Sequence, residues 1–147
     1  MTIQLTWDDL LIKDFGADDA SLWIAEWPTL VSGRFHPVFM SKFGDWFLRR
    51  SDGTTGLLDV LEGTLTTIAK STAEFDDALN EIEWQEKHLL SWLVYELHQD
   101  GKIPAKSQCY GFTPHPGVGG QIDRCTTMLF DIPVWQTICS QTLFPRQ

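Results

Sequence analysis

FGDWFLRRSDGTTGLLDVLEGTLTTI, residues 43–68, is the most strongly patterned stretch of the chain. Its runs of apolar and β-branched residues are separated by two turn signals, Asp52-Gly53 and Glu62-Gly63, and glycine adopts the positive φ that such turns require. The stretch therefore predicts a meander of three antiparallel strands. It contains no nucleophile, metal-ligand cluster or phosphate loop, so its chemistry indicates a scaffold or a binding surface.

The composition fits one ordered domain, residues 1–147. The chain has 43% hydrophobic and 12% aromatic residues, including seven Trp and nine Phe, which is far from the profile of a disordered protein. A length of 147 residues is also typical of a single domain with a sizeable core.

The charge is strongly acidic. Eleven Lys and Arg against twenty Asp and Glu give a formal net charge of −9. Direct binding of nucleic acid needs a basic surface, so we exclude it. Two explanations of the acidity stay open: solubility, or the steering of a basic partner such as a nuclease.

Cysteine usage and hydropathy indicate an intracellular protein. The three cysteines, Cys109, Cys125 and Cys139, form no CxxC pair, so neither a disulfide framework nor a structural zinc site is indicated. The start of the chain shows no basic leader, and no apolar run is long enough to cross a bilayer. We therefore expect a cytoplasmic protein that makes no membrane contact.

Helices are expected before and after the meander. Thr6 with Asp9 suggests a capped first turn, and a second short helix is predicted over 19–26, with Leu22 on its apolar side. The stretch 29–42 is expected to be a covered loop or an irregular strand. After the meander, a helix is predicted to start with a cap at Ser71 or Thr72, and a second helix is predicted to meet it near residues 82–84 and to end at Gly101.

The last third is expected to hold a loop, a strand and a helix. Prolines and glycines in 106–121 predict an irregular but packed loop, and 125–132 has the composition of a last strand that extends the sheet. Pro133 then opens a closing helix, with Val134 and Ile138 on its buried side. The predicted fold class is α+β, a small antiparallel meander sheet with helices packed on one face.

The candidates for chemistry all have structural alternatives that we favour. Cys109, His115 and Cys125 could in principle gather around a metal, but a loop histidine on the surface is the simpler interpretation. Cys109 could be a nucleophile, yet a buried small residue fits better. Asp59 and Glu62 could form a carboxylate pair, although a solvent-facing or turn-satisfying role is favoured for Asp59. We predict no catalytic residue, metal or cofactor.

Two blocks of the sequence resemble a known bacterial family. FGDWFLRRSDGTTGLLDVLEGTLTTIA at 43–69 and QCYGFTPHPGVGG at 108–120 are similar to the conserved blocks of the C-terminal domain of type VI secretion immunity proteins that neutralise a DNase effector. The resemblance covers about 30–138 and leaves 1–29 as a short N-terminal helical region. It implies structural roles for the motif residues Gly44, Asp45, Trp46, Phe47, Asp59, Gly63, Cys109, Tyr110, Gly111, Phe112, Gly119 and Gly120.

The resemblance implies a non-catalytic immunity-type protein that binds and neutralises a toxic effector, and the acidity suggests that this partner is basic. Exposed acids are then the candidate contact residues: Asp52, Glu62, Glu83 and Glu86. One or two Trp residues near Trp84 are candidate anchors for the partner. An alternative is a small-ligand-binding or enzymatic domain that uses the loop 109–121 as a pocket wall.

Overall fold

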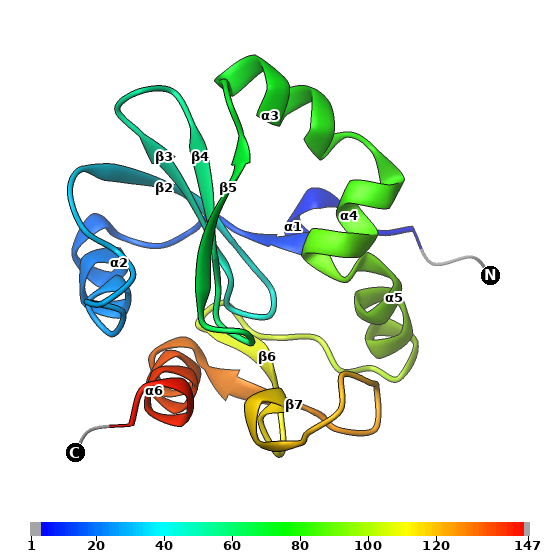
Figure 1. The fold of residues 1–147 in the computed structure, drawn as a ribbon. Coiled ribbons are helices and arrows are strands. Elements are labelled where there is room, and N and C mark those ends of the chain that lie inside the picture. The colour runs from blue at the N-terminus through cyan, green and yellow to red at the C-terminus, as the bar shows by residue number, and fades with distance from the viewer. Residues whose placement is uncertain (1–3, 146–147) are drawn as a thin grey trace.

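The meander is confirmed, and its three strands form one end of a larger antiparallel sheet (Figure 1). The computed structural model describes residues 4–145. Five strands follow one another across the sheet in chain order: β1 (Leu11–Ile12), β2 (Phe35–Ser41), β3 (Trp46–Arg50), β4 (Thr55–Asp59) and β5 (Thr64–Ala69). The α+β class predicted from the sequence is therefore correct.

Turn chemistry explains where the meander reverses. Gly53 and Gly63 both have positive φ, 89° and 73°. In the first turn, Oδ1 of Asp52 accepts hydrogen bonds from the backbone N–H and the hydroxyl of Thr54, at 3.0 and 2.7 Å. The side chain of Asp52 thus stabilises the turn through hydrogen bonds within it.

The stretch 29–42, whose prediction was open, ends in the irregular strand β2. Its register with β3 shifts between Pro37 and Phe39, so the strand carries a bulge. Proline has no N–H to donate, which is why it lies at an irregular point of the ladder.

Helices cover both faces of the sheet, which goes beyond the single covered face expected from the sequence. Trp46 contacts Phe15 and Trp23 on one face, with ring centroids 5.3 and 6.3 Å apart. On the opposite face, Phe47 contacts Phe75 and Trp84, at 6.1 and 5.6 Å. Successive strand residues point to opposite faces, so two adjacent large apolar residues require cover on both.

The two N-terminal helices are short. α1 (Trp7–Leu10) has the expected cap, in which Asp9 accepts a hydrogen bond from the backbone N–H of Thr6 at 2.8 Å. α2 (Ala17–Ile24) begins two residues earlier than predicted. The expectation for Leu22 was wrong, because its side chain is 69% exposed and the core side of α2 is formed by Ala20 and Ile24.

Three helices follow the meander, not two. They are α3 (Thr72–Leu79), α4 (Ile82–Leu89) and α5 (Ser91–Gln99). The Ser71 cap is confirmed, since its hydroxyl accepts a hydrogen bond from the N–H of Glu74 at 3.1 Å. The second break, at Leu90, was missed because the apolar pattern runs through it while the backbone turns to a φ of 51°.

The strand predicted at 125–132 does not extend the main sheet. β7 (Thr127–Asp131) pairs with β6 (Gln108–Phe112) in a separate two-stranded sheet. The expectation that 106–121 holds no regular element was therefore wrong for its first half. β6 forms because Tyr110 and Phe112 pack onto Phe43, with centroids 5.3 and 5.6 Å apart.

The chain closes with the 3-10 turn η1 (Pro116–Val118) and the helix α6 (Ile132–Leu143), where Pro133 lies in the first turn as expected. The buried side of α6 differs from the prediction: Trp135, Gln136 and Cys139 are fully buried, whereas Val134 is exposed. Within residues 4–145, no helix is both long and apolar enough to cross a membrane.

Candidate functional site

The acidic residues are concentrated in the helices α3 to α5. Residues 72–100 contain eight Asp and Glu and a single basic residue, Lys87, which gives this segment a formal charge of −7 in a chain of −9. Six of these acids are exposed on α3, α4 and the junction between them: Glu74, Asp76, Asp77, Glu81, Glu83 and Glu86. We call these six residues the acidic face.

No cation of the described chain neutralises the acidic face. The ion pairs within residues 4–145 join Lys106 to Asp14 and Arg124 to both Glu96 and Asp100. Asp76 and Asp77 also lie in the second half of α3, near the negative end of the helix dipole, where an acid destabilises the helix. These two acids therefore oppose the stability of α3 and call for another explanation, whereas Glu74 and Glu83 lie in first turns, where an acid is favourable.

A shallow groove with both polar and apolar side chains in its walls lies between α1 and α4, next to the acidic face. Its volume is about 180 Å³, and Leu5, Trp7, Leu10 and Gln85 line it. Trp7 is 38% exposed there. Ile82, one helical turn before Gln85 on α4, is 71% exposed. Large exposed apolar side chains among carboxylates are typical of protein-binding surfaces.

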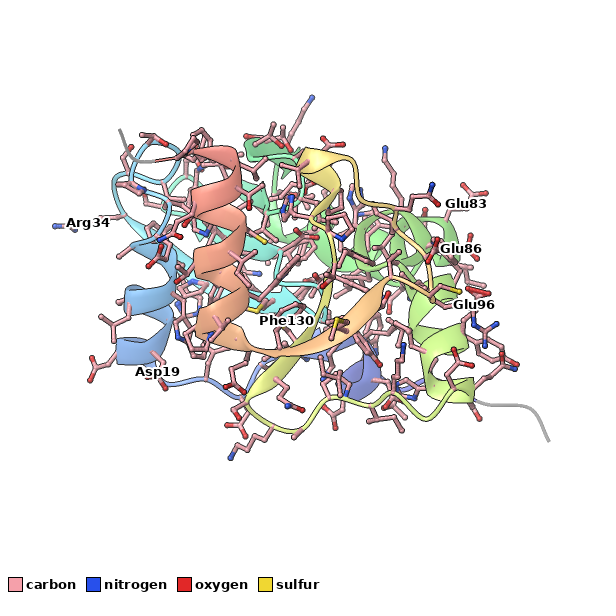
Figure 2. All side chains as sticks on the ribbon, turned by 90° about the horizontal axis from the view of Figure 1, so that it is seen from below. Asp19, Arg34, Glu83, Glu86, Glu96 and Phe130 are labelled. Atoms are coloured by element: carbon pink, nitrogen blue, oxygen red, sulfur yellow. The ribbon has the colours of Figure 1, made fainter. Side chains whose placement is uncertain are left out.

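The structure brings together only two of the four predicted contact residues. Glu83 and Glu86 lie on α4, and Figure 2 shows them on one side of the molecule, away from Asp19 and Arg34. Asp52 and Glu62 are both exposed, but they lie in the turns at opposite ends of β4 (Figure 1). A single compact interface around α4 would exclude Asp52, whose carboxylate is also engaged in its own turn.

The motif residues of the first block are held by α6. Oε1 of Gln136 accepts hydrogen bonds from the indole N–H groups of Trp27 and Trp46, at 2.9 and 3.3 Å. Its amide nitrogen donates to the carbonyl of Gly44 at 2.9 Å. Trp135 donates to the carbonyl of Phe43, also at 2.9 Å. Every polar atom of the Gln136 side chain thus has a partner in the core.

The second motif block, 108–120, contacts the first block, 43–69, and also packs against α6. The N–H of Tyr110 donates to the carbonyl of Lys42 at 2.7 Å. A Cβ on Gly111 would lie 2.6 Å from both Trp135 and Phe130, so only glycine fits there. Gly119 has a φ of 94°, and a Cβ on Gly120 would collide with the carbonyl of Pro114. These positions shape the core.

Asp45 is a buried acid in the same core. Its Oδ1 accepts a hydrogen bond from the N–H of Val60 at 2.9 Å, and the hydroxyl of Ser41 lies 3.5 Å from Oδ2. Burial raises the pKa of this carboxyl well above its usual value, and the nearby Asp59 raises it further. Asp59 itself accepts hydrogen bonds from the N–H groups of Leu61 and Glu62, at 2.9 and 3.0 Å, which is the turn-satisfying role favoured from the sequence.

His115 is buried, so its interpretation as a surface loop residue was wrong. Its Nδ1 accepts a hydrogen bond from the N–H of Gly117 at 2.8 Å, which leaves Nε2 to donate to the carbonyl of Val60 at 3.2 Å. Burial lowers the pKa of its imidazole. This histidine is therefore neutral and joins the loop 113–118 to the meander.

The cysteines do not gather around a metal. Cys109 and Cys139 are buried and Cys125 is exposed. Burial raises the pKa of both buried thiols, which disfavours the thiolate that nucleophilic attack requires. Within residues 4–145, no group of three His, Cys, Asp or Glu side chains is placed to hold a metal ion.

The segment 109–121 is divided: 109–112 and His115 are buried in the core, whereas 113–114, 117–119 and Gln121 are exposed. Its buried side chains are Cys109, Tyr110, Phe112 and His115. Val118 departs from the expectation of a packed loop, because its side chain is 64% exposed. The burial of the aromatic residues gives no support to the idea that this segment is a pocket wall.

The comparisons with known proteins show the fold alone. No protein-family model matches the sequence, and no curated protein matches it. Among solved structures, the crystal structure of Atu4351 from Agrobacterium tumefaciens is similar, with a TM-score of 0.58 and 19% sequence identity. The similarity covers 82% of this chain and 63% of that one, so the chain spans less than two thirds of the length of its structural neighbour.

Proposed function

We propose that the protein is a non-catalytic, immunity-type binding protein that neutralises a basic toxic effector through its acidic face. The observation that carries this proposal is the charge of −7 on residues 72–100, together with six exposed acids that have no ion pair within the described chain. A basic partner that covers Asp76 and Asp77 would offset the destabilising effect of these two carboxylates on α3.

A nuclease is the partner that fits this surface best. An enzyme that binds DNA presents Lys and Arg to the phosphates, and a surface of closely spaced carboxylates can occupy the same site. Long-range attraction between the two charges speeds their association. Blocking such an enzyme requires only occlusion, so the proposed role involves no reaction of the inhibitor itself. The effector would act on DNA, and we place the inhibitor in the cytoplasm for that reason.

The family resemblance supports the same proposal. Buried residues of its two blocks meet at Trp135 and Gln136 and maintain the fold, whereas exposed residues of the same blocks, such as Asp52 and Glu62, are free to vary. Trp7 and Ile82 supply exposed apolar anchors beside the acids. Apolar anchors ringed by charge are the usual composition of a tight protein interface.

The first experiment tests the biological role. The protein is co-expressed with the candidate toxins encoded beside its gene, and survival of the host is scored together with recovery of the toxin in a pull-down. Rescue with co-purification of a basic toxin is the expected result. If no neighbouring toxin is bound and none is neutralised, the immunity role is rejected.

The second experiment locates the interface. Glu83→Gln with Glu86→Gln should slow association with the toxin and weaken its salt dependence, because two steering charges are lost. Asp18→Asn with Asp19→Asn is the matched control: the same change of charge, made on α2. Asp19 lies on the side opposite Glu83 and Glu86 (Figure 2). If both pairs of substitutions slowed association with the toxin equally, the interface would lie elsewhere.

A further inference from the structure

A second cavity lies on the other side of the molecule, between α2 and the start of β2. Its volume is about 580 Å³. That is within the range of roughly 300–1,000 Å³ that is usual for small-molecule sites. Phe15, Ala20, Ile24, Phe35 and Pro37 give it predominantly apolar walls.

Small residues keep this cavity open. Ala17 and Ala20, one helical turn apart on α2, have side chains too short to fill it. Opposite them, Gly33 has a φ of 80°, and a Cβ built on it would meet nothing within 4 Å. The backbone at Gly33, just before β2, therefore does not pack against α2.

The one formally charged side chain that lines the cavity is a cation, in a protein whose net charge is −9. Arg34 and His36 line it together with Ser21, and no acid does. Arg34 is exposed, extends outward at the edge of the molecule (Figure 2), and is in no ion pair of the described chain. A free guanidinium at the mouth of an apolar cavity matches a carboxylate with an apolar body.

We propose that this cavity binds a small organic carboxylate, whose apolar body lies between α2 and β2 and whose carboxylate pairs with Arg34. One guanidinium supplies one positive charge and a fork of two N–H donors, which fits a monoanionic planar carboxylate better than a phosphate dianion. His36 and Ser21 add hydrogen-bond donors at the rim. The site is separate from the acidic face and does not depend on the proposed function.

The test uses decanoate as the probe, with decanol as its uncharged analogue and acetate as the charged group without the apolar body. Binding is followed by calorimetry and by chemical-shift changes of the α2 and 33–37 backbone amides. Decanoate should bind and shift these amides, whereas acetate should not. Decanol should bind at least about fivefold more weakly, which corresponds to one exposed ion pair.

Variants separate the charge from the cavity. Arg34→Gln should weaken decanoate binding by about fivefold, while Lys87→Gln on α4, with the same change of net charge, should leave it unchanged. Ser21→Leu and Ala17→Phe lie on the exposed surface of α2, so they fill the cavity without disturbing the core, and each should abolish binding. Equal binding of decanol and decanoate, or full binding by both filled variants, would overturn the proposal.

Discussion

Gln136 accepts a hydrogen bond from the indole of Trp27, 2.9 Å away, although 109 residues separate the two in the chain. Both side chains are fully buried. The same amide also bonds to Trp46 and Gly44, so one side chain of α6 joins the N-terminal segment to the turn between β2 and β3. A polar residue in an aromatic core is stable only because each of its groups is satisfied.

Replacing Gln136 should therefore be costly. Gln136→Leu leaves two indole N–H groups and the carbonyl of Gly44 without partners, and we expect a loss of at least about 3 kcal/mol in the free energy of unfolding. Urea denaturation measures it. Gln141→Leu, at an exposed position of the same helix, is the control and should change stability little. A loss below about 1 kcal/mol for Gln136→Leu would show that the network contributes little.

Gly44 and Gly33 form a matched pair of positive-φ glycines. Gly44→Ala places a Cβ 2.9 Å from the ring of Trp135, in addition to the strain of a φ of 96°. Gly33→Ala has a φ of 80° and open space, so it carries the strain alone, about 1–2 kcal/mol. Thermal unfolding should show a clearly larger loss at Gly44, and similar losses at both sites would contradict the close packing of α6 on this turn.

We expect the buried carboxyl of Asp45 to make the stability of the protein depend on pH. Its folded-state pKa is raised, so the folded protein holds the proton to higher pH than the unfolded chain. Stability from this group is therefore present at low pH and is lost as pH rises from the usual value of 3.8 through the raised folded pKa.

Asp45→Asn should remove this dependence, because the amide oxygen can still accept the hydrogen bond from Val60. Urea midpoints of both proteins between about pH 4 and pH 8 test it, with the variant gaining relative to the wild type as pH rises. Parallel curves would mean that the carboxyl titrates alike in both states. His115, whose pKa is lowered, contributes the opposite trend in both proteins and cancels in the comparison.

Leu90 joins α4 to α5 in a left-handed conformation, with a φ of 51°. Leu90→Gly should change stability by no more than about 1 kcal/mol, because the strain that glycine relieves offsets the lost partial burial. Leu93→Ala, at a fully buried position of α5, should cost about 2–5 kcal/mol in the same urea assay. Equal losses would show that Leu90 is unstrained.

We expect Asp76 and Asp77 to lower the stability of α3 while they favour the binding of a basic partner. Asp76→Asn with Asp77→Asn should raise the melting temperature, since both acids lie near the negative end of the helix. Asp18→Asn with Asp19→Asn should lower it, because these acids occupy the first turn of α2. A lower melting temperature for the α3 variant would remove the argument that Asp76 and Asp77 oppose the stability of α3.

The local features of the fold could be predicted from the sequence. The meander, its glycine turns, the Ser71 and Thr6 caps and the α+β class were all predicted correctly, because turn chemistry, capping and strand alternation depend on residues close together in the chain. The sequence also identified Glu83 and Glu86 as exposed acids. It missed Trp7, Ile82 and the acids of α3, for which the charge density of 72–100 was the available signal.

The packing partner of each element could not be predicted from the sequence. In the folded protein, helices cover both faces of the sheet, and β6 pairs with β7 instead of extending the meander. His115 is buried, and a cavity lies beside α2. An apolar pattern shows that a residue will be buried but does not name its neighbour. The Gln136 network joins residues about a hundred positions apart, and such contacts follow from the shape of the whole core.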